Sequence, residues 1–99
     1  DYAALPVLPK ALDFAARGCV TGASARNWLA YGYQVDLDSG RFGDCERALL
    51  TDPQTSGGLL ISCAQEVVTE VLAVFLQQGF DHAAVIGEIV AGKPEVKFV

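Results

Sequence analysis

The sequence lacks any apolar run long enough to cross a membrane. Its longest apolar segments, such as Leu59–Ile61 and Val71–Leu76, fall far short of the ~20 residues that a membrane-spanning helix needs. The first six residues also lack the charged start, apolar middle and small-residue cleavage site of a secretion signal. These absences predict a protein that is not embedded in a membrane and that works in the cytoplasm.

Basic residues are few and scattered. Seven Lys and Arg against twelve Asp and Glu leave a formal net charge of −5 at pH 7. No block of positive charge provides the electrostatic footprint that binding to nucleic acid or to an anionic membrane requires. We therefore expect neither of these partners, and we expect any anionic ligand to be held by local groups.

Cysteine is scarce as well. Cys19, Cys45 and Cys63 form no CxxC pair, which argues against a disulfide framework and against a zinc site built from cysteine alone. Reduced, mostly buried thiols are the expected state of all three. A protein of the reducing cytoplasm fits this cysteine usage.

Side chains that commonly hold a metal ion or move a proton do not form a clear motif. His82 is the only histidine, no catalytic partner is visible near it, and it is expected at the surface. Asp36, Asp38 and Asp44 lack the remaining positions of a calcium-binding loop. We expect a solvated loop there and no metal site in this chain.

Apolar residues, in contrast, are abundant. They make up 52% of the 99 residues, which is more than enough to build one hydrophobic core. The sequence therefore predicts one domain or part of one.

Apolar periodicity and helix-ending residues predict three short helices in the first half. Pro9 suits the first position of a helix and Gly18 a C-terminal stop, while Gly32 ends the next apolar-periodic stretch. Asp44 is expected to cap a further helical turn. The helices are expected at about residues 9–17, 23–31 and 45–50.

The second half alternates strand-like and helical segments. Strands are expected at Leu59–Ile61, 84–90 and 96–99, and a helix that ends at Gly79 separates the first two. The apolar stripe of that helix consists of Val68, Val71, Leu72 and Phe75, and Val67, Val74 and Leu76 widen it. Polar and glycine-containing residues 33–43 indicate a surface connection. This order of elements predicts an α/β or α+β fold in which helices pack against a sheet.

The stretch TDPQTSGG at 51–58 is more elaborate than a simple turn requires. Gly57 and Gly58 can adopt positive φ and let another backbone or a ligand come close. The hydroxyls of Thr55 and Ser56, with the N–H groups of the loop, could donate to phosphate oxygens. It is not a Walker loop, because it contains no lysine and no Gly-Lys-Ser/Thr follows. A tight packing corner remains the alternative interpretation.

A second candidate is the glycine-led helix start Gly22–Asn27. Free N–H groups at such a start could face an anion, and Arg26 could give bidentate hydrogen bonds. An ordinary capped helix with a solvated arginine is the alternative, and without other information it is the favoured one.

The segment LLTDPQTSGGLLIS at 49–62 resembles the signature of the C-terminal domain of selenophosphate synthetase, also called selenide, water dikinase. This family belongs to the superfamily that includes aminoimidazole ribonucleotide synthetase. Further segments agree in order, so the resemblance covers nearly the whole chain. They are LPVLPKALDFAARGCVTG at 5–22, Gly22–Asn27 followed by Tyr31-Gly32, and Ile86–Ile89.

The resemblance implies an ATP-dependent enzyme that makes selenophosphate from selenide and releases AMP and orthophosphate with magnesium. It implies a domain of the aminoimidazole ribonucleotide synthetase type, with helices packed on a mixed sheet. In the family the loop at 51–58 lies on the side facing the active-site cleft. The ligand-binding residues expected on this basis are Asn27, Gln54, Thr55, Ser56, Gly57 and Gly58.

The family's dimer barrel, nucleophilic cysteine or selenocysteine, nearby lysine and metal-binding aspartates belong to an N-terminal domain. The resemblance therefore predicts that residues 1–99 are a single, incomplete C-terminal domain, truncated at its N-terminal side, whose partners are that ATP-binding domain and a second copy of the protein. None of the three cysteines matches the nucleophile's context, so no catalytic residue is expected here. Ala23 departs from the commonest family pattern, which has a second glycine there.

ATP and magnesium are the cofactors that the resemblance implies for the full-length enzyme, and neither is expected to bind this chain tightly by itself. A non-catalytic binding or dimerisation module derived from this domain is the alternative function. A relative of thiamine-phosphate kinase or of a hydrogenase-maturation protein fits DPQTSGG less well.

Overall fold

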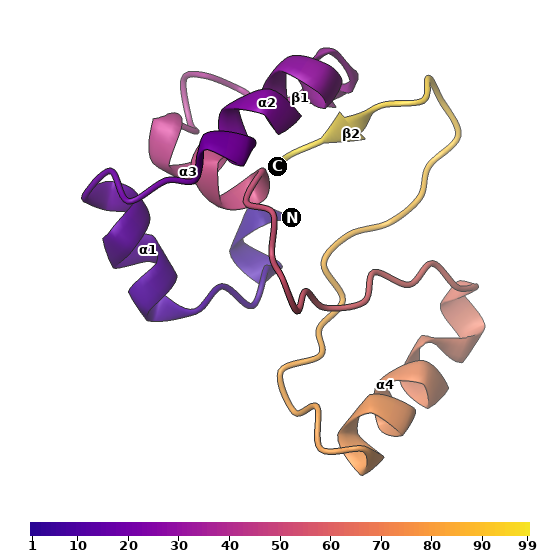
Figure 1. The fold of residues 1–99 in the computed structure, drawn as a ribbon. Helices are drawn as coiled ribbons and strands as arrows, with labels where there is room; N and C mark the ends of the chain where they lie inside the picture. The colour runs from indigo at the N-terminus through magenta and orange to yellow at the C-terminus, as the bar shows by residue number, and fades with distance from the viewer. The chain divides into compact units, whose positions relative to one another are not determined.

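The computed structural model describes residues 1–99 (Figure 1). Its elements, in chain order, are η1 (Tyr2–Ala4), α1 (Pro9–Ala16), α2 (Gly22–Tyr31), η2 (Gly32–Gln34), β1 (Val35–Asp36), α3 (Asp44–Leu50), η3 (Gln65–Val67), α4 (Val68–Gln77) and β2 (Val96–Lys97), where η marks a 3₁₀ helix. The chain folds as two compact units. We call residues 7–57 with 91–99 the sheet unit, and residues 1–6 with 58–90 the α4 unit.

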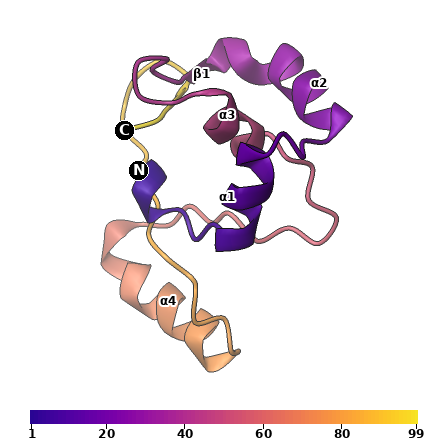
Figure 2. The same cartoon turned by 90° about the vertical axis from the view of Figure 1, so that its left-hand side faces the viewer.

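The first helix of the sheet unit follows its sequence signals. Pro9 lies in its first turn, where a missing N–H costs no hydrogen bond. Gly18 has φ +77°, and the N–H of Cys19 donates to the carbonyl of Phe14 at 2.9 Å, which closes the helix as a Schellman motif. The helix predicted over 9–17 is confirmed to within one residue, and α1 packs on α3 (Figure 2).

The helix of the α4 unit is confirmed too. The four central residues of the predicted stripe, Val68, Val71, Leu72 and Phe75, are the half-buried positions of α4. The residues expected to widen it, Val67, Val74 and Leu76, are exposed. Gly79 has φ +85°, and the N–H of Phe80 donates to the carbonyl of Phe75 at 2.9 Å. The rings of these two phenylalanines meet edge to face with centroids 6.2 Å apart, the hydrophobic contact that commonly accompanies a Schellman end.

The predicted third helix is present, but its cap differs. Gly43 is the N-cap of α3, and Asp44 is the first residue inside the helix. The carboxylate of Glu46 accepts from the N–H of Gly43 at 2.8 Å, while Asp44 pairs with Arg47 at 2.8 Å. The prediction that Asp44 caps this helix is therefore wrong, because the helix begins one residue earlier than expected and places Gly43 at the N-cap, where its N–H donates to the Glu46 side chain. Both acids still suit the positive end of the helix dipole.

The sheet has two strands, and they are parallel. Val35 pairs with Val96, and Asp36 pairs with Lys97. The N–H of Phe98 extends the pairing to the carbonyl of Asp36 at 3.0 Å, and Lys97 Nζ lies 3.4 Å from Asp36 Oδ2. Helices with a small sheet agree with the predicted α+β class, and the sheet is parallel where a mixed one was expected.

Residues 33–43 are more than a surface connection. They contain β1 and Phe42, which is the most buried apolar side chain at 8% exposure. The Phe42 ring meets that of Phe98 edge to face with centroids 6.4 Å apart. The prediction was wrong here because polar residues surround Phe42 in the sequence, whereas its burial comes from a residue far along the chain.

Two of the predicted strands are absent. Residues 59–61 and 84–90 carry no regular secondary structure, although their composition favours extended backbone. A strand needs a neighbour to receive its N–H and C=O groups, and neither segment has a ladder partner in the α4 unit. Of the third predicted strand, 96–99, the first two residues pair as β2.

Few side chains are buried. Phe42 and Ser24 are the only residues in the buried class, while many large apolar side chains are exposed, among them Leu59, Leu60 and Ile89. The single core expected from the apolar content is therefore not formed. Each unit is small, and small units keep much of their surface in contact with solvent. No helix is both long and apolar enough to span a bilayer.

The cysteines are free but not buried as expected. Cys19 and Cys63 are exposed and Cys45 is half-buried. Cys19 follows the helix-ending Gly18, and Cys63 lies in a segment without regular structure, so neither sits on the covered face of an element. His82 is exposed, as expected.

Candidate functional site

The loop at 51–58 leaves α3 and is exposed from its second residue onward. The N–H of Gln54 donates to the carbonyl of Asp52 at 3.1 Å, which makes the tight turn that the Asp-Pro pair predicts. Thr55 and Ser56 follow this turn and are accessible to a ligand. Two hydroxyls and several backbone N–H groups can therefore act as hydrogen-bond donors here.

The paired glycines of the loop provide space and not an unusual backbone. The glycines with positive φ are Gly18 and Gly79, so Gly57 and Gly58 do not use the left-handed conformation that is open to them. A Cβ on Gly57 would lie 3.4 Å from Oε1 of Gln54, and a Cβ on Gly58 would meet nothing within 4 Å. The surface at each glycine is open enough for a ligand or another backbone to approach.

Three side chains tie the loop to α2, and we call Ser24, Asn27 and Thr51 the polar clamp. Asn27 Nδ2 donates to the carbonyl of Thr51 at 2.9 Å. Thr51 Oγ1 hydrogen-bonds to Ser24 Oγ and donates to the carbonyl of Arg47 at 2.8 Å. Ser24 is only 4% exposed. The first residue of the loop is thus held by its backbone and by its side chain.

The polar clamp brings together the two stretches that the sequence singled out separately. Asn27 was expected to bind a ligand, and its amide nitrogen instead contacts Thr51 of the neighbouring motif. Ser24 and Thr51 were missed as functional candidates. The available signal was a small hydroxyl residue in each motif, since such residues often bond to nearby backbone groups.

The start of α2 agrees with the capped-helix interpretation. Thr21 Oγ1 accepts from the N–H of Ser24 at 3.3 Å, and a cap of this kind contributes about 1 kcal/mol to helix stability. Arg26 is exposed, as the solvated-arginine alternative expects. One of the helix-start donors is therefore already used by the protein itself.

A small hollow of about 230 Å³ lies between α2 and α3 and was not expected from the sequence. The guanidinium of Arg47 stands 5.6 Å from the ring centre of Trp28 and also pairs with Asp44 at 2.8 Å. The contact with Trp28 joins α3 to α2, while the pair with Asp44 lies within α3.

Acidic side chains do not converge on a common point. Asp36 pairs with Lys97 at 3.4 Å, and Asp38 Oδ1 accepts from the N–H of Gly40 at 2.8 Å. Asp44 belongs to α3, where it pairs along the helix. No group of three or more His, Cys, Asp or Glu side chains could hold a metal ion.

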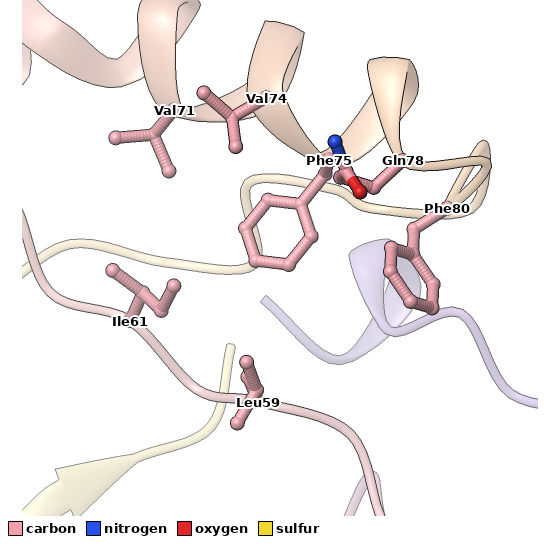
Figure 3. Close-up of a pocket in the computed structure, with 7 residues that line it drawn as sticks. All are labelled: Leu59, Ile61, Val71, Val74, Phe75, Gln78 and Phe80. Atoms are coloured by element: carbon pink, nitrogen blue, oxygen red, sulfur yellow. The ribbon is translucent and has the colours of Figure 1, made fainter.

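The α4 unit contains an apolar hollow of about 320 Å³ (Figure 3). Valines and a phenylalanine of α4 line one side, and the apolar residues that follow the loop line the other. The lining residues are Leu59, Ile61, Val71, Val74, Phe75, Gln78 and Phe80. Their side chains point toward a shared open space, and Val74 and Leu59 among them remain largely exposed.

Comparison with known proteins decides the family. The model of the family described as AIR synthase related protein, C-terminal domain, matches residues 5–99. The chain belongs to this family. The expected resemblance to the C-terminal domain of the aminoimidazole ribonucleotide synthetase type is thereby confirmed.

Curated relatives of this C-terminal domain carry one name. The selenide, water dikinase of Dechloromonas aromatica is 54% identical over the whole chain, which covers 28% of that protein. Those of Pseudomonas straminea and Burkholderia orbicola are 56% and 57% identical over 97% and 96% of the chain, each match covering 27% of the relative. The chain thus spans about a quarter of the length of these relatives. No solved structure gives a significant match.

Proposed function

We propose that this chain is the C-terminal part of a selenide, water dikinase, an enzyme that makes selenophosphate from selenide and ATP. The observation that carries the proposal is identity of 54% along the entire chain to a protein of that name. The exposed TDPQTSGG loop, held at its first residue by the polar clamp, supports it. A loop that is open yet anchored at one end suits contact with a ligand that must be placed accurately.

In this proposal the loop supplies hydrogen-bond donors to phosphate oxygens of ATP. Gln54, Thr55 and Ser56 are exposed, and the open surface at Gly57 and Gly58 leaves room for a bulky anion. ATP supplies the phosphoryl group. The residues of this chain do not fit a magnesium centre, because no set of carboxylates gathers in the structure.

The proposal includes a partner domain and a cellular compartment for the chain. We propose that it works with an N-terminal ATP-binding domain, which provides the metal ligands and cations that phosphoryl transfer needs, within a dimer. Three free thiols, two of them exposed, suit a reducing compartment, so we place the protein in the cytoplasm.

The test of the proposed function is selenide-dependent formation of AMP by the longer protein that contains this domain. Replacing both loop hydroxyls, Thr55→Val with Ser56→Ala, is expected to lower kcat/KM for ATP about tenfold, since each lost hydrogen bond is worth about 0.5–1.5 kcal/mol. The matched control is Ser62→Ala with Thr69→Val, which makes the same changes at exposed positions outside the loop. The assignment fails if wild-type protein forms no selenide-dependent AMP, or if both double variants lose equal activity.

An association module is the second candidate, and the apolar hollow of the α4 unit favours it. Val74 is 59% and Leu59 is 80% exposed, although apolar patches of this kind are usually covered in stable monomers. Since the relatives are much longer than this chain, we propose that further parts of the longer protein cover this face. In the isolated chain a second copy takes their place.

Light scattering on the isolated chain tests this second candidate. We expect dimers or larger species at high concentration, and we expect Leu59→Ser with Val74→Ser to shift them to monomers, because the double change removes two large apolar contacts. Leu29→Ser is the control, since Leu29 is 83% exposed and lies in α2 of the other unit. Strictly monomeric wild-type chain would count against the association module.

A further inference from the structure

We infer that Asn27, Ser24 and Thr51 are positioning residues that fix where the TDPQTSGG loop leaves α3, and that Asn27 acts through this contact and not by touching the ligand. The inference rests on the proposed function, because it assigns the loop a ligand to be positioned against. It deepens that function by naming the residues that hold the loop in place.

The hydrogen-bond directions in the clamp follow from simple counting. Thr51 has one hydroxyl proton, and the carbonyl of Arg47, 2.8 Å from Oγ1, can only accept. The Thr51 hydroxyl therefore donates to Arg47, and its oxygen accepts the proton of Ser24. A more distant carbonyl, that of Ala48, lies 3.4 Å from Ser24 Oγ. Each hydroxyl thus has a defined role, and the chain of bonds runs from α2 into α3.

The clamp acts at the point where α3 runs out of backbone partners. The last carbonyls of a helix have no N–H of their own helix to accept from. Here the carbonyl of Arg47 accepts from the Thr51 N–H at 3.2 Å and also from the Thr51 hydroxyl at 2.8 Å. The carbonyl of Thr51, the C-cap residue, accepts from the Asn27 amide. The Thr51–Arg47 bond is local to α3, whereas the bonds of Ser24 and Asn27 join residues 24 or more positions apart. These longer-range bonds fix the loop's exit against α2.

The burial of Ser24 supports a specific role of the clamp. It is the only buried polar residue of the chain, and a buried hydroxyl costs free energy unless it is hydrogen-bonded. Its partner is the first residue of the exposed loop. Thr51 alone would be enough to cap the C-terminus of α3. Ser24 and Asn27 belong to a different helix, α2, so their bonds to this region have a further effect.

The experiment measures loop mobility and turnover on the longer protein that contains this domain. Asn27→Ala and, separately, Thr51→Val remove clamp hydrogen bonds, and we expect amide hydrogen exchange of residues 52–57 to become about tenfold faster. We expect kcat to fall about tenfold while the KM for ATP changes less than about threefold. A loop that is held less firmly is expected to stabilise the transition state less, while the affinity for ATP changes little. Asn27→Asp keeps the shape without the donor and replaces Asn27→Ala should that variant not fold.

Two controls separate positioning from stability. Thr51→Ser keeps the hydroxyl and is expected to retain exchange and kcat near the wild-type values. Thr21→Ala removes the cap of α2 without touching Thr51, and it is expected to leave exchange of residues 52–57 within about twofold of the wild-type rate.

The outcomes distinguish a positioning role of the clamp from a purely structural one. Unchanged exchange in both clamp variants, or equally fast exchange in Thr21→Ala, overturns the inference. Faster exchange with unchanged kcat also overturns it, since the clamp would then be architecture alone. Should the wild-type protein lack selenide-dependent turnover, the proposed function fails, and faster exchange limited to the clamp variants would still establish that these residues hold the loop.

Discussion

The isolated 99-residue chain is expected to form no AMP above background from ATP and selenide. Phosphoryl transfer depends on metal ions and cations placed around the reacting phosphate. This chain has no cluster of His, Cys, Asp or Glu that could hold a metal ion, and the loop at 51–58 contains no lysine or arginine. The measurement is AMP formation by purified chain in the presence of selenide and magnesium.

The control for this result is the longer protein that contains the domain, which is expected to form AMP under identical conditions. Activity that scales with the concentration of the purified chain would show that residues 1–99 carry a complete catalytic centre. That result would contradict the proposed division of labour with an N-terminal ATP-binding domain.

Gly57→Val in the longer protein is expected to lower turnover about a hundredfold while changing the stability of the domain by less than about 1 kcal/mol. The structure predicts the small stability effect, because Gly57 has no positive φ and its added Cβ would make only ordinary van der Waals contacts with Gln54, at 3.4 Å from Oε1, 3.5 Å from Cβ and 3.9 Å from the carbonyl oxygen. The large effect on turnover is expected because a branched side chain occupies the open surface that a ligand would use. Thermal midpoint and turnover per folded molecule are compared.

A packing corner predicts the opposite pattern for Gly57→Val. It would cost about 1–3 kcal/mol of stability and leave the activity of each folded molecule unchanged. Gly92→Val serves as the control, since Gly92 lies in an exposed segment where an added Cβ meets nothing within 4 Å. Equal loss of turnover in the two variants would remove the special role of Gly57.

The helices could be predicted because their signals lie within a few residues of one another. Pro9 and Gly18 bound α1, and Gly79 ends α4, in each case through a local hydrogen-bond pattern. The apolar stripe of α4 is read directly from spacing along the chain. Asp44 was misassigned because the helix begins at Asp44 itself, so that Gly43 is the N-cap and its N–H donates to Glu46, three residues further on.

The strands could be predicted only in part, because composition does not supply a partner. Residues 84–90 have the β-branched composition of a strand and remain unpaired in the α4 unit. Val35, inside a segment expected to be a surface connection, pairs with Val96. Pairing depends on which segments meet in space, and this information is not contained in either segment alone.

The candidate site, like the strands, could be predicted only in part. Its loop was recognisable from TDPQTSGG, and the family followed from this motif and was confirmed by the match over residues 5–99. The sequence suggested close approach at Gly57 and Gly58, and only the structure shows that neither has positive φ and that an added Cβ on Gly58 would meet nothing within 4 Å.

By itself the sequence determined the helices, the family and the position of the exposed loop, since periodicity, end residues and a long motif all act over short stretches of chain. Only the tertiary structure decided that β1 and β2 pair in parallel, that Phe42 is buried beside Phe98, and that Asn27 holds the first residue of the loop. These contacts join residues 24 to 61 positions apart. Local propensity does not predict contacts over such separations. The net free energy of a long-range contact depends on the folding of all the segments that bring the two residues together.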